Sequence, residues 1–220
     1  MDKAEYKDRF DKLYSNLLGA CATFYVWKGL QEKSYETTYS RAIYFWSATL
    51  LALQNEWLLS LAKCFEESSF SKNNKVISVY ALIKHHPDFA RAKKLDDFLN
   101  KHKKVIGPIS RLRDNQLAHL NAKHLKNPAK LLKKFPIDYG EVEDLLNDFP
   151  NLISLLNPEP GIGYGLDNYI KVPVYEAKHV MTQIQYFNQL EKEHLDRFVT
   201  GEIDDPNFPP IKNNTRHLPS

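Results

Sequence analysis

Cysteine is scarce in this sequence, and its scarcity excludes one class of protein. Only two of the 220 residues are cysteines, Cys21 and Cys64, and each lies among apolar residues. Small secreted domains are held together by several disulfides, and two thiols in helical sequence do not provide such a framework. We expect both thiols to be free and to pack as small apolar side chains.

Long uninterrupted apolar runs are also missing. The most apolar stretch, 42–61, is broken by Ser47, Gln54, Asn55 and Glu56, whereas a membrane-spanning helix needs about 20 predominantly apolar residues. The first ten residues are charged and contain no apolar segment of the kind found in signal peptides. The sequence therefore predicts no membrane association and a reducing, cytoplasmic location.

Apolar residues recur at three- and four-residue spacing through most of the chain, which predicts amphipathic helices. No pair of strands is evident, and only the β-branched run within 76–84 leaves a strand as an alternative to a helix. We therefore expect an all-α helical bundle that forms a single domain over 1–200, followed by a poorly ordered, irregular tail over 201–220. The expected helices are 2–28, 39–67, 76–84, 88–101, 108–126, 138–149 and 174–199. Apolar residues occupy several faces of the helix over 39–67, so we expect it to be the central one.

Charge is strongly segregated along the chain although the net charge is only +3. The segment 91–134 holds thirteen Lys or Arg against three Asp, whereas 135–170 holds seven acidic residues and neither Lys nor Arg. One interpretation is a positive face that suits a polyanion. The other is that the two segments neutralise each other across the fold, and the sequence leaves both open.

The segment 109–124, ISRLRDNQLAHLNAKH, carries the residues best suited to chemistry. On a helix, Arg111, Asn115 and His119 share one face, and Arg113 lies about 9 Å along the axis from His119. Histidine can take up and release a proton near neutral pH, and arginine is a fixed cation suited to phosphate oxygens. Because Arg113 and His119 lie on different sides of the helix, we expect a homodimer in which a second copy completes the site.

This pattern resembles a known family. Arg113-Asp114-Asn115 followed by Leu117-Ala118-His119 is similar to the arginine–polar–histidine signature of the HEPN superfamily, with a spacing one residue longer than its commonest form. The segment YFWSATLLALQNEWLLSLAKCFE resembles the abortive-infection AbiU-like branch. The resemblance implies a small helical bundle, a homodimer with two motifs facing a shared cleft, and metal-independent RNA cleavage in phage defence or a toxin-like role.

The resemblance also implies a role for each candidate residue. Arg113 would stabilise charge on the phosphate, His119 would act as general acid or base, and Asp114 or Asn115 would orient one of these groups or the 2′-hydroxyl. The expected partners are RNA, a second copy and an antitoxin or other regulatory protein, with no cofactor and no metal. Basic residues around the motif would contact RNA phosphates: Arg111, Lys123, Lys126, Lys130, Lys133 and Lys134.

Other interpretations stand beside this one. Arg113 and Asp114 can form a surface ion pair, and His119 can be a core residue. In that case the chain would be a non-catalytic helical interaction or nucleotide-binding module. The adjacent His85 and His86 point about 100° apart on a helix and make a poor metal pair. Gly161, Gly163 and Gly165 follow no strand, so we interpret them as a flexible loop and not as a phosphate cradle.

Overall fold

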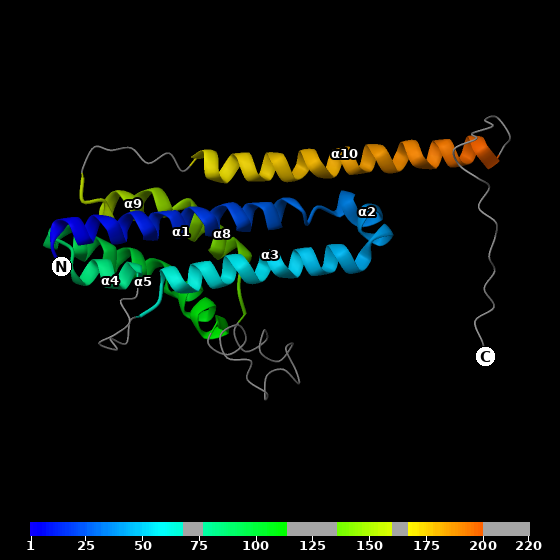
Figure 1. Cartoon of the computed structure of the whole chain (residues 1–220). Helices are drawn as coiled ribbons and strands as arrows, with labels where there is room; N and C mark the ends of the chain where they lie inside the picture. Colours follow the sequence, from blue (N-terminus) through cyan, green and yellow to red (C-terminus); the bar gives the residue numbers. More distant parts are fainter. Residues whose placement is uncertain (68–76, 114–135, 160–166, 200–220) are drawn as a thin grey trace.

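The computed structural model describes residues 1–67, 77–113, 136–159 and 167–199 of the chain (Figure 1). Within these ranges the secondary structure is helical and no strand is present, so the predicted all-α bundle is confirmed. The expected tail over 201–220 and the glycines at 161–165 lie outside the described residues. In chain order the elements are α1 (Lys3–Gly29), the 3₁₀ turn η1 (Lys33–Tyr35), α2 (Glu36–Arg41), α3 (Ile43–Cys64), α4 (Val79–Lys84), α5 (Phe89–Leu112), α8 (Tyr139–Asn147), α9 (Phe149–Leu156) and α10 (Asp167–Val199).

The central helix is α1, which packs against α3 on one side and α10 on the other (Figure 1). The Asp2 carboxylate caps it by accepting a hydrogen bond from the Glu5 backbone N–H at 2.7 Å. The apolar stripe predicted for this helix is confirmed, because all its members are buried: Tyr6, Phe10, Leu13, Leu17, Cys21 and Phe24. The hydroxyl of Tyr6 also donates to the Leu156 carbonyl at 3.0 Å, which ties α1 to α9.

The second long helix differs from the prediction at its start and in its surroundings. It begins at Ile43 and not at Tyr39, because Ala42 leaves the helical conformation with φ −142° and ψ 54° and separates α2 from α3. The sequence predicted that this helix is central, since apolar residues occupy several of its faces. That prediction is wrong for its first half: Phe45 is 63% exposed and Leu51 is 55% exposed.

The largest correction concerns α5. The sequence predicted one helix ending near Lys101 and a second starting at Pro108, but α5 runs without a break from Phe89 to Leu112 with Pro108 inside it. A proline removes one helical hydrogen bond and normally ends or kinks a helix. Here the apolar stripe continues at helical spacing on both sides of the proline, and its burial outweighs that cost: Leu95, Phe98, Leu99, Val105, Ile106, Ile109 and Leu112.

The short helices begin at a side-chain cap or at a proline. Ser78 caps α4 by accepting from the Ala81 N–H at 3.2 Å, so Val79–Lys84 of the β-branched run is helical. Asp138 caps α8 by accepting from the N–H groups of Gly140 and Glu141. Pro150 lies in the first turn of α9, where its missing N–H costs no helical hydrogen bond. Together with α5, these helices gather at one end of the molecule (Figure 1).

The last helix is longer than expected and is buried along only part of its length. It begins at Asp167, ahead of the predicted Val174, and includes Pro173. Ala177 and Met181 are buried in a second core cluster with Leu30 and Tyr35. Farther along the helix the apolar side chains of Phe187, Leu190 and Leu195 are exposed.

Both cysteines are free and buried in the main core. Burial raises the pKa of each thiol to about 12, so each is neutral at physiological pH and packs as an apolar group. This outcome agrees with the sequence-based expectation. None of the helices in the described ranges is long and apolar enough to cross a membrane.

Candidate functional site

The carboxyl end of α5 positions the candidate arginine. Arg113 is the C-cap residue of this helix, and its backbone N–H donates to the carbonyls of Ile109 and Ser110. Leu112, its neighbour, is 1% exposed and anchors this turn in the core. The guanidinium Nη1 lies 2.9 Å from a carboxylate oxygen of Glu66, which follows the end of α3. An ion pair between two helix ends therefore fixes the Arg113 side chain, which is 16% exposed.

Arg113 lines a groove of about 370 Å³ between the end of α3, α4 and the last third of α5. The α5 residues recur at a spacing of three or four and so present one face of the helix to the groove. The residues that line it are Phe65, Glu66, Glu67, Tyr80, Lys103, Ile106, Gly107, Ser110, Arg111 and Arg113. Three cations and two carboxylates thus line the groove, together with the apolar side chains of Phe65 and Ile106.

The acidic side of the groove is itself hydrogen-bonded. Burial raises the pKa of the Tyr80 phenol, and the charge of Glu67 together with a hydrogen bond to Glu67 raises it further. The phenol is therefore protonated at physiological pH and donates to the Glu67 carboxylate. Since Glu66 pairs with Arg113, both carboxylates of the groove have partners. Lys103 and Arg111 add positive charge on the α5 side, where an anion would be attracted.

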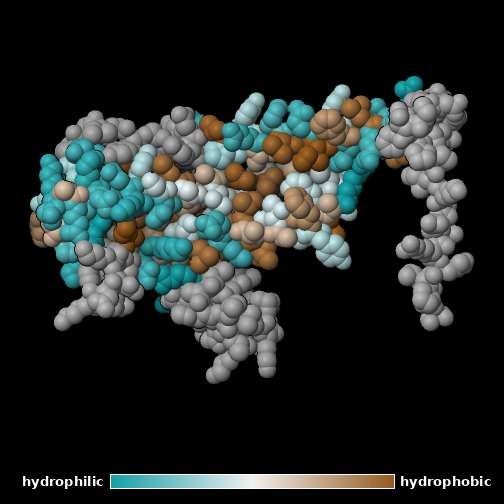
Figure 2. Space-filling model, viewed as in Figure 1, coloured by the Kyte–Doolittle hydropathy of each residue, from teal (hydrophilic) through white to brown (hydrophobic). Residues whose placement is uncertain are grey.

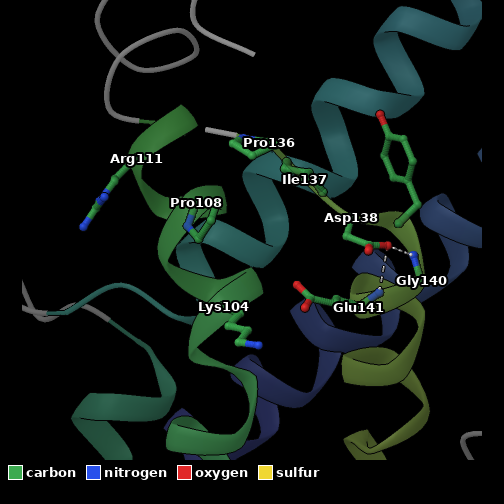
Figure 3. A pocket seen from close by; sticks show the side chains of 9 residues that line it. Lys104, Pro108, Arg111, Pro136, Ile137, Asp138, Gly140 and Glu141 are labelled. Atoms are coloured by element: carbon green, nitrogen blue, oxygen red, sulfur yellow. Dashed lines mark hydrogen bonds between the residues drawn. The ribbon is translucent and has the colours of Figure 1, made fainter. Parts of the chain in front are cut away.

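A second groove, of about 730 Å³, lies on the other side of the same helix end (Figure 3). Lys104 and Pro108 from α5 face Ile137, Asp138 and Glu141 across it, and Lys104 and Glu141 point toward one another. Arg111 borders both grooves and extends away from α8 in this view. The last third of α5 therefore contributes basic side chains to both grooves.

The charge segregation seen in the sequence is partly used inside the fold. Asp148, between α8 and α9, accepts hydrogen bonds from Lys101 Nζ at 2.7 Å and from His102 Nε2 at 2.9 Å. Glu143 of α8 pairs with Lys28 of α1 and not with α5. Neutralisation within the fold is therefore seen at the middle of α5, where Asp148 meets Lys101 and His102. The positive face for a polyanion stays a prediction.

The structure describes only two of the sequence-predicted site residues, and it brings both to the same groove. These are Arg111 and Arg113. The others lie outside the described residues, namely Asp114, Asn115, His119, Lys123, Lys126, Lys130, Lys133 and Lys134. The relation between Arg113 and His119 therefore remains the sequence-based prediction.

Sequence reasoning missed Glu66, Glu67, Tyr80 and Lys103 as neighbours of Arg113. Glu66 is 47 positions from Arg113 in the sequence, and it belongs to a different helix end. The only available signal was a pair of acidic residues directly after a long apolar helix, which is common on protein surfaces. Such contacts depend on the packing of α3 against α5, which a single sequence does not specify.

Two of the histidines in the described residues, His86 and His102, hydrogen-bond to the backbone or to a carboxylate. Nδ1 of His86 lies 3.0 Å from the Asp88 backbone nitrogen and 2.9 Å from the Asp88 carbonyl oxygen, and Nε2 lies 3.0 Å from the Leu155 carbonyl oxygen. His102 is 5% exposed and bonds to Asp148. Among the residues that the structure describes, no group of three His, Cys, Asp or Glu side chains is placed to hold a metal ion.

Comparison with known proteins gives one positive result. The family model HEPN_AbiU2, described as AbiU2, matches residues 3–159. No curated protein and no solved structure matches the chain. The matched range includes the helices from α1 to α9, the Arg113 groove and the segment from Arg113 to His119. Because it covers well over half of the 220 residues, the chain belongs to the AbiU2 branch of the HEPN superfamily.

Proposed function

We propose that this protein is a metal-independent endoribonuclease that acts in phage defence or a toxin-like role, with Arg113 and His119 as its catalytic residues. The observation that carries the proposal is the position of Arg113, on a groove lined by Lys103 and Arg111, inside the segment matched by the AbiU2 family model. HEPN membership supports a HEPN-like function, and the name of the branch makes abortive infection its natural setting. Cleavage of RNA goes beyond membership of the family, and the experiment below tests it.

The proposed reaction is an internal transfer within the RNA. The ribose 2′-oxygen attacks the adjacent phosphorus and forms the O2′–P bond, while the bond from phosphorus to the 5′-oxygen of the next nucleotide breaks. One proton leaves the 2′-hydroxyl and one is delivered to the departing 5′-oxygen, and His119 is suited to either transfer. Arg113 stabilises the negative charge that develops on the phosphate oxygens. Asp114 or Asn115 orients His119, Arg113 or the 2′-hydroxyl.

Glu66 gains a role in this proposal. A guanidinium has five N–H donors, so Arg113 can keep one contact with Glu66 while it presents others to a phosphate. The carboxylate would hold the arginine in one orientation before the RNA binds. Arg111 and the five lysines predicted from the sequence would hold the RNA backbone beside the groove, namely Lys123, Lys126, Lys130, Lys133 and Lys134. RNA, a second copy and an antitoxin or other regulator remain the proposed partners.

The test is cleavage of single-stranded RNA by the purified full-length protein. Since the nucleophile and the phosphate both belong to the RNA, activity should persist in excess EDTA, and the products should carry a 2′,3′-cyclic phosphate and a 5′-hydroxyl. An Arg113→Ala preparation made in parallel controls for contaminating nucleases. Products with 5′-phosphates, or equal activity in the Arg113→Ala preparation, would contradict the proposal.

A second candidate function is a non-catalytic interaction or nucleotide-binding module. The observation that favours it is the Arg113–Glu66 ion pair, because an arginine that is only 16% exposed can serve to join α5 to α3. In that case RNA or a nucleotide would bind without being cut. Titration with a labelled RNA that stays intact throughout the measurement would favour the module.

A further inference from the structure

Two acidic residues border the Arg113 groove, and the proposed cleavage reaction uses only one of them. Glu66 holds Arg113 through the ion pair at 2.9 Å. Glu67, the next residue, is exposed, lines the same groove and receives the hydrogen bond of the Tyr80 phenol. A carboxylate beside a phosphate site repels the phosphate and weakens RNA binding unless it contacts another part of the ligand. A ligand that fits the whole groove must therefore offer hydrogen-bond donors to Glu67.

The groove is divided by charge into two sides. Lys103, Arg111 and Arg113 supply the positive side from α5, whereas Glu67 and Tyr80 lie on the side of α3 and α4. Its volume of about 370 Å³ is in the range of small-molecule pockets, roughly 300–1,000 Å³. The groove therefore suits a ligand that has an anionic end and a planar end with hydrogen-bond donors. A nucleotide unit of single-stranded RNA has both.

The surface around this end of the molecule is polar. Figure 2 shows that the end formed by the shorter helices is largely hydrophilic, whereas apolar side chains gather over α10 and the neighbouring part of α3. The groove lies among the helices of the hydrophilic end, between the end of α3, α4 and α5. An RNA strand brings phosphates and hydroxyls to the surface next to its binding groove, so a hydrophilic surround favours RNA over an apolar ligand.

Tyr80 determines how the Glu67 carboxylate is presented. The phenol donates to this carboxylate, and an ionised carboxylate has about four lone-pair positions on its two oxygens. Both oxygens can therefore still accept hydrogen bonds from a ligand, while the bond from Tyr80 restricts the rotation of the Glu67 side chain. Tyr80 is partly buried against the main core, which fixes the position of its ring.

We propose that Glu67 recognises a guanine base of single-stranded RNA and that Tyr80 positions its carboxylate. The Watson–Crick edge of guanine has two adjacent donors, N1–H and the N2 amino group, which match the two oxygens of a carboxylate. On adenine and cytosine one amino donor is followed by a ring-nitrogen acceptor, and on uracil the single N–H lies between two carbonyls. Each of these acceptors would face the negative carboxylate, so the other three bases are disfavoured.

This inference rests on the proposed function, because it names the base that the ribonuclease site would recognise. A guanine in contact with Glu67, next to a phosphate held by Arg113, would place cleavage beside guanines. Glu67 is thus a specificity-determining residue and Tyr80 a positioning residue, and neither takes part in proton transfer.

Binding of an uncleavable RNA analogue tests the base preference apart from cleavage. The probe is a short labelled 2′-O-methyl oligouridylate with one different base at its centre, which lacks the 2′-hydroxyl that the proposed reaction requires. By fluorescence anisotropy, the full-length wild type should bind the guanine probe about tenfold more tightly than the adenine or cytosine probe. Equal dissociation constants for the three probes would overturn the proposal. Displacement of the guanine probe by micromolar guanosine monophosphate would assign the groove to a free nucleotide and would overturn the commitment to RNA.

Glu67→Gln tests the residue that reads the base. An amide has one acceptor and one donor, which can match a neighbouring donor and acceptor on any of the four bases, so the ratio of dissociation constants should fall close to one. Loss of a negative charge strengthens binding of every probe, and the ratio is therefore the readout. Glu56→Gln, at an exposed position on α3 away from the groove lining, is the matched control and should keep the guanine preference. A Glu67→Gln variant with the wild-type ratio would refute the role of Glu67.

Tyr80→Phe removes only the phenol oxygen and so tests the positioning role. The guanine preference should fall between those of the wild type and Glu67→Gln, because the carboxylate is present but no longer held. A purely structural role for Tyr80 would instead change the affinity for all probes equally and leave their ratio unchanged. An unchanged ratio in Tyr80→Phe would thus contradict the positioning role.

Mapping of cleavage sites in a mixed-sequence RNA separates this inference from the proposed function. The wild type should cut beside guanines, and Glu67→Gln should cut without that preference. Cleavage by the wild type at all four bases alike would refute the guanine preference while RNA cleavage itself stands. Absence of cleavage would instead contradict the proposed function, and the ratios of probe binding would still decide whether Glu67 recognises guanine.

Discussion

Arg113 serves two roles at once in this account, because it joins α5 to α3 through Glu66 and is also the proposed phosphate ligand. Lysine keeps the charge but lacks the planar fork that can contact a carboxylate and a phosphate together. We expect Arg113→Ala to lower the rate of RNA cleavage about 10²- to 10³-fold, and Arg113→Lys to fall between Ala and the wild type. Arg197→Lys, on the exposed part of α10, should leave the rate unchanged. Full activity in Arg113→Lys would mean that only charge matters at this position.

Asp148 predicts a pH dependence of stability. Burial raises the pKa of its carboxyl, but the hydrogen bonds from His102 and Lys101 lower it more, so the net pKa lies below the ordinary value of 3.8. A carboxyl whose pKa is lower in the folded state stabilises the fold above its unfolded pKa. That contribution is lost as the pH falls through the folded pKa. The free energy of unfolding should therefore drop from about pH 5 downward.

Asp148→Asn removes this contribution while it keeps the size of the side chain. Urea unfolding between pH 7 and 3 should show a shallower loss of stability in Asp148→Asn than in the wild type. Asp8→Asn is the matched control, since Asp8 is an exposed member of an i,i+4 pair with Lys12 and such pairs contribute little. Parallel pH profiles for Asp148→Asn and the wild type would show that the carboxyl does not couple to folding.

At the scale of the elements, α1 could be predicted well from the sequence and α5 could not. The stripe of α1 is regular, its cap residue is an Asp, and no proline lies within it. In α5 the local signal from Gly107-Pro108 conflicts with the periodic burial of Val105, Ile109 and Leu112. A local rule predicts a break, but the outcome depends on the tertiary contacts of the whole helix.

Pro108 offers a test of that conflict. Alanine at this position restores an N–H that can donate to the Lys104 carbonyl one turn earlier, and alanine is about 3 kcal/mol more favourable than proline inside a helix. Because proline also restricts the unfolded chain, we expect Pro108→Ala to stabilise the protein by a smaller amount, on the order of 1 kcal/mol. Thermal unfolding would measure it. A clear decrease in melting temperature would show that the proline conformation is required by its surroundings.

The first half of α3 is a second case in which the local sequence pattern and the tertiary structure differ. Its sequence is apolar on several faces, which indicates burial, and one of those faces is exposed in a single copy. The sequence pattern indicates that a helix face is apolar, but it does not indicate whether another part of the fold covers that face. The central position expected for α3 inside the fold was therefore wrong for this half.

At the scale of the whole molecule, only the two arginines of the described candidate site could be predicted from the sequence. The motif identified Arg113 and Arg111 because residue type and spacing carry chemical information. Glu66, Tyr80 and Lys103 join them only through the packing of α3, α4 and α5. The predicted division into a domain over 1–200 and a tail stays a prediction, since the residues beyond 199 lie outside the described ranges.

The segregated charge predicts salt-dependent RNA binding. On a single strand each phosphate contact contributes roughly −0.7 to the slope of log K against log salt concentration. If Lys130, Lys133 and Lys134 all contact phosphates, replacing the three with Ala should make the slope less steep by about 2. Fluorescence anisotropy with a short labelled RNA at several salt concentrations would measure it. An unchanged slope would show that these lysines do not contact RNA phosphates and face the solvent instead.

The central claim, RNA cleavage by the Arg113–His119 motif, is tested most directly by His119→Ala. The measurement is the initial rate of cleavage of a labelled single-stranded RNA in EDTA, made beside a melting curve of each preparation. We predict a rate about 10²- to 10⁴-fold below that of the wild type, with an unchanged melting temperature. If folded His119→Ala cuts the RNA as fast as the wild type, His119 is not the proton-transfer residue and the interaction-module function takes its place.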